Sequence, residues 1–129
     1  MGIRDRAGVL TVTGTSGINA GDNSITLDEV TNNFIGAVSL TTTNTSAVEI
    51  TDGGALTLGT LSLGGGLTVI STGALDLGTG AIGGALLATS NDGAISQAGV
   101  LTVTGTSGIN AGDNSITLDE VTNNFIGAV

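Results

Sequence analysis

Acidic side chains are the groups of this sequence best suited to acid–base catalysis, because the residues that usually share that work are missing. The chain contains 11 Asp and Glu residues but no His, Cys, Tyr or Trp. Nucleophilic catalysis and most proton transfers therefore lose their usual side chains. Adjacent acids occur at Asp28-Glu29 and Asp119-Glu120, but neighbouring strand residues point to opposite faces, which does not suit a glycosidase carboxylate pair. We expect no catalytic residue and a protein that is not an enzyme.

Calcium binding is the second chemistry that acidic residues suggest, since carboxylates are the oxygen ligands that calcium prefers. The candidate ligands are Asp22, Asp28, Glu29, Asp52, Asp76 and Asp92. The GGxGxDxUx pattern of calcium-binding β-rolls does not occur in the chain. Asp22-Asn23, Asp52-Gly53 and Asp92-Gly93 are more simply explained as turn formers. We expect no metal site and no cofactor.

Threonine recurs at every second position in the segments 11–15, 41–45 and 102–106. A flat grid of Thr on a β-solenoid is an ice-binding surface, but it requires coils of even length so that the Thr columns stay in register. Here the spacing varies, and VEI, LDL and LSL interrupt the pattern. Because Thr is also a common polar strand residue, a solvated face is the simpler interpretation.

The elements that must position these side chains are short strands. Apolar and polar residues alternate over three or four positions, and Gly, Asn, Asp, Ser and Thr fill the spacers. This alternation places Leu, Val and Ile on one face and polar residues on the other. The predicted strands are 10–12, 25–27, 38–40, 48–50, 56–58, 61–63, 67–69, 75–77, 85–88, 94–96, 101–103 and 116–118.

Strands this short favour a parallel β-helix over a β-sandwich, whose strands usually have about five or six residues. In a β-helix each strand forms one wall, each turn forms a corner, and successive coils stack on one another. Three walls and about 20 residues per coil give about six coils and a length of roughly 30 Å. We therefore predict an all-β parallel β-helix, or β-solenoid, without helices.

The charge of the chain restricts its possible partners. Two Lys and Arg stand against 11 Asp and Glu, a formal net charge of −9, and both cations, Arg4 and Arg6, precede residue 7. Nucleic-acid binding depends on cations that neutralise phosphates, and anionic membranes attract the same residues. No apolar run approaches the roughly 20 residues of a membrane span. We expect neither nucleic-acid binding nor membrane insertion.

A long segment occurs twice without a single substitution. Residues 7–38 reappear as residues 98–129, at an offset of 98 − 7 = 91. Independent drift would have changed surface positions, where substitutions cost little, so the match indicates recent duplication or deliberate construction. We expect one β-solenoid domain over 7–129, with a repeat unit at 7–97 and a partial second copy at 98–129. Residues 1–6 are interpreted as an artificial tag or the start of a fragment.

Three segments resemble the tandem-repeat regions of filamentous haemagglutinin-like bacterial surface adhesins, which are exported by two-partner or autotransporter routes. They are AISQAGVLTVTGT at 94–106, DNSITL at 113–118 and NNFIGAV at 123–129, and the style extends over nearly all of the chain after Arg6. The resemblance implies a right-handed β-helix, export to the bacterial cell surface and the role of a structural stalk.

The function expected from these observations is structural. A stalk segment without polar caps would expose unpaired strand edges at both ends, so homotypic end-to-end stacking is expected beside contacts with neighbouring repeats. Two alternatives stay open. One is a module that binds ice or carbohydrate, although an aromatic patch for sugar is missing. The other is an engineered or truncated self-assembling unit with no function of its own.

Overall fold

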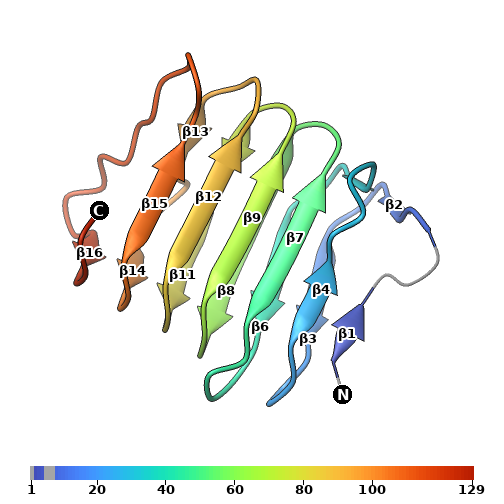
Figure 1. Cartoon of the computed structure of the whole chain (residues 1–129), viewed down its shortest axis with the longest axis horizontal. Helices are drawn as coiled ribbons and strands as arrows, with labels where there is room; N and C mark the ends of the chain where they lie inside the picture. Colours follow the sequence, from blue (N-terminus) through green and yellow to red (C-terminus); the bar gives the residue numbers. More distant parts are fainter. Residues whose placement is uncertain (1, 5–7) are drawn as a thin grey trace.

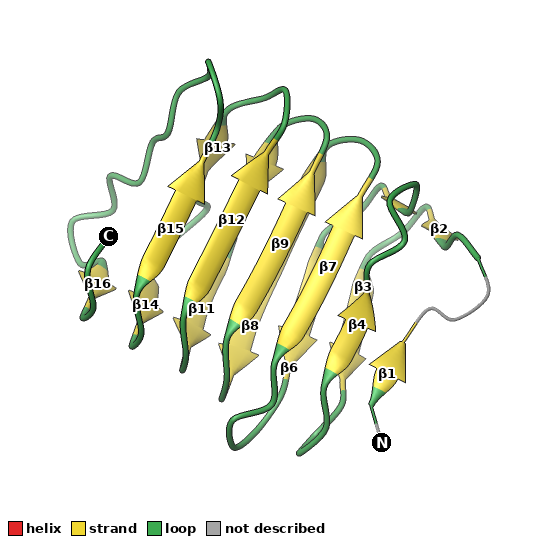
Figure 2. Cartoon of the chain, viewed as in Figure 1, coloured by secondary structure: helices red, strands yellow, loops and turns green. Residues whose placement is uncertain are grey.

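Sixteen short strands wind into a three-walled β-solenoid of about six turns, in a computed structural model that describes residues 2–4 and 8–129 (Figure 1). The pairings between strands are parallel, and this part of the chain contains no helix (Figure 2). The coils stack in chain order from one end of the solenoid to the other. The predicted fold class, an all-β solenoid of about six coils, is confirmed.

Each wall is a stack of strands from successive coils. Wall 1 contains β1 (Ile3–Arg4), β4 (Ile25–Leu27), β7 (Val48–Asp52), β9 (Leu67–Ser71), β12 (Leu86–Ser90) and β15 (Ser107–Asn110). Wall 2 contains β2 (Thr11–Val12), β5 (Asn33–Phe34), the start of β8 (Leu56–Leu63), β10 (Leu75–Asp76) and β13 (Ile95–Ser96). Wall 3 contains β3 (Ser16–Asn19), β6 (Val38–Thr41), the end of β8, β11 (Thr79–Ile82), β14 (Leu101–Val103) and β16 (Asn124–Phe125). Strand β8 therefore passes from wall 2 to wall 3.

Coil length varies along the solenoid. One column of wall 1 is formed by the successive Cα partners Ile3, Ile25, Val48, Leu67, Leu86 and Ser107. The coil from Ile25 to Val48 is long, with a sequence offset of 48 − 25 = 23, whereas the next coil is short, with an offset of 67 − 48 = 19. The expectation of uneven coils is therefore correct, and the corners absorb the difference.

The core is a continuous aliphatic column inside the three walls. In β7, Val48 and Ile50 are buried while Glu49 between them is exposed, as the period-two pattern requires. Phe34 is 2% exposed and lies in this core, while its counterpart Phe125 at the C-terminal end is only partly buried. The fully buried large side chains include Phe34, Ile25, Leu40, Ile50, Leu56, Leu58, Leu61, Leu67, Leu75, Leu77, Ile82, Leu86, Ile95 and Leu101.

The alternating segments predicted as strands form strands, with one exception. The prediction at 116–118 is wrong for a named strand, because the segment contributes only an isolated bridge from Ile116 to Ile95. Segments 56–58 and 61–63 join into β8. Six further strands form outside the predicted segments, namely β1, β3, β5, β11, β15 and β16. Ser16–Asn19 and Ser107–Asn110 were missed because each contains a single large apolar residue.

Candidate functional site

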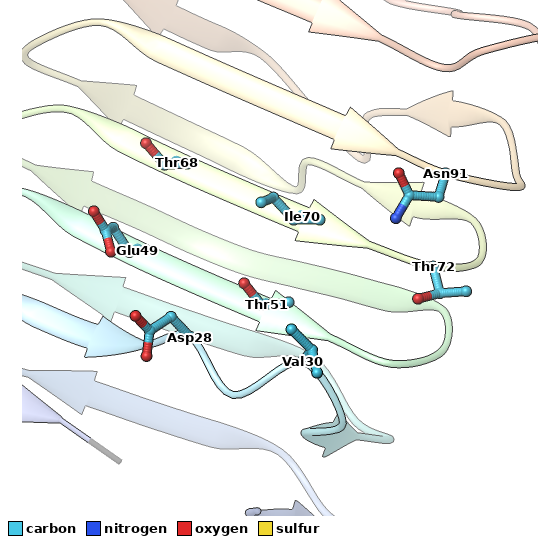
Figure 3. A pocket seen from close by; sticks show the side chains of 8 residues that line it. All are labelled: Asp28, Val30, Glu49, Thr51, Thr68, Ile70, Thr72 and Asn91. Carbon is cyan, nitrogen blue, oxygen red and sulfur yellow. The ribbon is translucent and has the colours of Figure 1, made fainter. Parts of the chain in front are cut away.

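A groove on the outer face of wall 1 offers several polar groups. It encloses about 430 Å³. Its side chains come from four successive coils, on β7 and β9 and just after β4, β9 and β12 (Figure 3). The lining residues are Asp28, Val30, Glu49, Thr51, Thr68, Ile70, Thr72 and Asn91. The wall positions them because alternate residues of β7 and β9 face solvent.

The groove offers hydrogen-bond acceptors and negative charge, but no aromatic ring. Asp28 and Glu49 supply carboxylates, three Thr supply hydroxyl groups, and Val30 and Ile70 supply an apolar surface. Its volume falls within the roughly 300–1,000 Å³ of small-molecule sites. Carboxylates and hydroxyl groups can bind the hydroxyl groups of a sugar or a cationic group, whereas they repel anions.

The acidic residues considered as calcium ligands are dispersed over the solenoid. Within residues 2–4 and 8–129, no three acidic side chains form a group that could hold a metal ion. Asp28 lines the groove of wall 1. Asp22 lies at an exposed corner, where its Oδ1 accepts a hydrogen bond from the Thr43 hydroxyl. The adjacent acids Asp119 and Glu120 are both exposed, at the C-terminal end.

Asp52 is buried, and its carboxylate accepts hydrogen bonds from two backbone N–H groups. The side chain is 0% exposed. Its Oδ2 accepts a hydrogen bond from the Phe34 N–H at 2.7 Å, and its Oδ1 accepts one from the Gly54 N–H at 2.7 Å. The first bond joins two coils and the second closes the corner, so Asp52 is a turn former, as expected, and also a link between coils.

The same corner device recurs at three further positions. In each, the side-chain oxygen of an Asp or Asn accepts a hydrogen bond from the N–H of a glycine two residues later, at 2.8–2.9 Å. The pairs are Asn19 with Gly21, Asp76 with Gly78, and Asn110 with Gly112. These three glycines have positive φ angles, which L side chains rarely adopt. The sequence signal of this corner is Asx-x-Gly, which does not appear among the predicted turn formers.

Asn32 and Asn123 stand at the same position of the two copies and make the same contact with the coil below. Asn32 is fully buried, and its Oδ1 accepts a hydrogen bond from the Leu10 N–H at 2.8 Å. The Asn123 Oδ1 accepts one from the Leu101 N–H at 2.8 Å. Gln97 adds a reciprocal pair of amide hydrogen bonds with Asn123, at 2.9 and 2.8 Å. These amides hold coils together.

Threonine does not form continuous columns on the outer faces. On wall 1 the column that contains Thr26 continues through Glu49, Thr68 and Leu87. On wall 3 the column reads Asn19, Thr41, Ser62, Ala81, Thr102 and Asn124. On wall 2, Thr11 pairs with Asn33. The flat Thr grid that ice binding requires is therefore missing at the first Thr of each of the three segments considered for it.

One family model matches almost the whole chain. It is described as repeats of unknown function (DUF5649), and it matches residues 2–41, 45–75 and 70–129. The chain belongs to this repeat family. Comparisons with curated proteins and with solved structures found no match.

Family membership supports the repeat architecture and names no activity. The matched segments include strands of all three walls, so the family's repeats form the solenoid itself. Nothing in these comparisons links the chain to filamentous haemagglutinin-like adhesins, and that resemblance stays a prediction. Within the described residues there is no helix long and apolar enough to cross a membrane.

Proposed function

We propose that the chain is a non-enzymatic spacer, a stiff segment of a large repetitive adhesin at the bacterial cell surface. The observation that supports this proposal best is that burial of a repeat residue depends on the presence of a neighbouring coil. Leu10 is 39% exposed in the first copy, whereas its counterpart Leu101 is 0% exposed. Ile25 is 0% exposed, whereas its counterpart Ile116 is 45% exposed.

These differences come from position along the solenoid, because the two segments are identical in sequence. Leu101 pairs with Gly80 of the preceding coil. Among the described residues, no preceding coil pairs with Leu10 in the same way. Each repeat therefore completes the core of its neighbour, and stability grows with the number of repeats. Such a polymer suits the separation of a distal domain from a surface.

Extension of the chain tests the proposal. Residues 39–129 would be appended after Val129, which adds one repeat in phase with the duplication. We expect one cooperative unfolding transition at a higher temperature than that of the parent chain, and slower amide exchange at Ile116. A separate transition for the added unit, with the parent transition unchanged, would contradict a continuous rod. Surface labelling of the producing cells with an antibody tests the location.

End-to-end association between molecules is proposed as the homotypic contact. The last coil exposes Ile116, Val121, Ile126 and Val129, and the first coil exposes Leu10. Burial of such surface against another molecule would be favourable, while the net charge of −9 opposes association at low salt. Sedimentation velocity at high salt should show mass that grows in whole-molecule steps with concentration. A single monomer species at every concentration would exclude the contact.

Carbohydrate binding in the groove of wall 1 is the second candidate function, favoured by its carboxylates and hydroxyl groups. Oligosaccharides would be titrated against the chain, with amide chemical shifts as the readout. Shifts at Thr68 and Ile70 that disappear in Glu49→Gln but persist in Glu120→Gln, which lies outside the groove, would support this candidate. Shifts spread evenly over the surface would dismiss it.

A further inference from the structure

We infer that successive copies of the repeat are turned by one wall about the solenoid axis, a third of a turn per repeat. The column of Cα partners that begins at Ile18 continues through Leu40, Leu61, Gly80 and Leu101. Four turns therefore correspond to a sequence offset of 101 − 18 = 83. The offset between copies is 109 − 18 = 91, so Ile109, the counterpart of Ile18, lies past the fourth turn by 91 − 83 = 8. These eight additional residues place Ile109 in the next wall.

Every pairing of the second copy agrees with this displacement. Ser16–Asn19 lies in wall 3, while its counterpart Ser107–Asn110 pairs with β12 in wall 1. Ile25 lies in wall 1, while Ile116 bridges to Ile95, which belongs to wall 2. Thr11 and Val12 lie in wall 2, and their counterparts in β14 lie in wall 3. Each identical segment moves forward by one wall.

The same repeat segment fits two different walls because its own contacts move with it. Asn32 and Asn123 each bind the backbone N–H of the residue 22 positions earlier. The Ile35 N–H donates to the Val12 oxygen at 2.9 Å, and the counterpart bond from Ile126 to Val103 has the same length. Corners of the Asx-x-Gly type recur at Asn19 and Asn110. One sequence therefore forms equivalent contacts in two different walls.

The displacement controls what a long array presents to its surroundings. The groove of wall 1 is lined by residues between Asp28 and Asn91, all within one repeat unit. In an array the groove would recur once in every repeat, about 21 Å farther along the axis, and would face a new direction each time. Three repeats restore the first direction after thirteen turns. A partner would therefore meet equivalent surfaces on three sides of the rod, whether or not the rod is a spacer.

Engineered thiol pairs in the present chain test the inference, since the chain contains no Cys. The one-wall displacement between copies arises because some coils are short. If the repeat made four full turns with no displacement, every coil would have to be almost as long as the one from Ile25 to Val48. Glu49 is the Cα partner of Thr68 across a short coil. If that coil were as long as its predecessor, Glu49 would instead lie beside Thr72. All three side chains line the outer groove, so the substitutions leave the core intact.

Spin labels would be attached to the Glu49→Cys/Thr68→Cys and Glu49→Cys/Thr72→Cys variants. Strong dipolar broadening is expected for the first pair, and clearly weaker broadening for the second. Thr26→Cys/Glu49→Cys is the control, because these Cα partners span the long coil and stay adjacent in either case. Thr51→Cys/Ile70→Cys measures the register of the short coil a second time. Stronger broadening in the 49/72 pair, or none in the 51/70 pair, would overturn the inference.

Discussion

Ile25 and Ile116 are the same residue of the repeat, yet they lie in different walls and differ in burial. Ile25 pairs with Val48 in wall 1 and is 0% exposed, whereas Ile116 bridges to Ile95 of wall 2 and is 45% exposed. The local sequence is identical on both sides, so the contrast comes from the neighbouring coils: Ile25 has a partner on both sides, Ile3 and Val48, whereas Ile116 has one, Ile95. This natural pair of sites allows stability effects to be compared without a change of side chain or neighbours in sequence.

Ile25→Ala should destabilise the chain far more than Ile116→Ala. Removal of a fully buried Ile side chain costs about 2–5 kcal/mol, whereas the half-exposed site should cost about 1 kcal/mol or less. Urea unfolding followed by circular dichroism measures both free energies of unfolding. Equal losses at the two sites would contradict the stacking described here.

The opposite order should hold for the first strand of the repeat. Leu101 is 0% exposed and Leu10 is 39% exposed, so Leu101→Ala should cost about 2–5 kcal/mol and Leu10→Ala much less. The same unfolding experiment applies. A larger loss at Leu10 than at Leu101 would show that the N-terminal coil is covered in solution, as it would be in an end-to-end assembly.

Asp52→Ala should destabilise the chain because it leaves two backbone N–H groups without their acceptor. Those groups belong to Phe34 and Gly54, and loss of hydrogen bonds to a charged group costs about 1.5–3 kcal/mol each. Hydrogen exchange at the Phe34 amide should accelerate in the same variant. Asp52→Asn, which keeps one oxygen acceptor, should lose less, and Asp92→Ala at an exposed corner should change little. An unchanged Phe34 exchange rate in Asp52→Ala would refute the link.

Ser107→Ala should stabilise the chain, while Ser90→Ala should destabilise it. The Ser107 hydroxyl is buried and has no hydrogen-bond partner among the described residues, so its removal should gain about 1 kcal/mol. The Ser90 hydroxyl lies 2.8 Å from the carbonyl oxygens of Gly73 and Gly93 and shares its single proton between them, so its removal should cost about 1 kcal/mol. The measurement is the sign of the change in the free energy of unfolding for each variant. A loss of stability in Ser107→Ala would be inconsistent with an unpaired hydroxyl.

Gly80→Ala should be strongly destabilising because the backbone there admits no side chain. Gly80 has φ 131°, and a Cβ atom would lie 2.0 Å from the Leu61 carbonyl oxygen of the coil below. We expect a loss of about 2–4 kcal/mol. Gly17 provides the control, since a Cβ atom at that strand position meets nothing within 4 Å. Gly17→Ala should be neutral or slightly stabilising, and a comparable loss at both glycines would refute the close approach at Gly80.

The sequence predicted the walls well where apolar residues alternate. Segments such as Val48–Asp52 and Leu67–Ser71 contain two large apolar residues on one face, and that pattern suffices for a strand. Ser107–Asn110 contains only Ile109, and Thr79–Ile82 contains only Ala81 and Ile82 as apolar residues. Pairing with neighbouring coils makes these segments strands, and that tertiary contribution leaves no local pattern.

The groove and the rotation of the repeat could not be predicted from the sequence. The groove brings together residues as far apart as Asp28 and Asn91, and their proximity depends on the length of each intervening coil. The long coil after Ile25 and the short coil after Val48 differ in their corners and in a register shift between β6 and β8, and neither feature is encoded by period-two alternation. The Asx-x-Gly corners were visible in the sequence as a local signal, so they could have been found.

Small-angle X-ray scattering of the parent chain and of the chain lengthened by residues 39–129 tests the central claim most directly, namely that each repeat adds turns to one rod. With stacked strands about 4.8 Å apart, four and a third turns should increase the maximum dimension of the monomer by about 21 Å. The radius of gyration of the cross-section should stay the same. An increase in the cross-section, or a length gain typical of a second body on a flexible linker, would contradict the account.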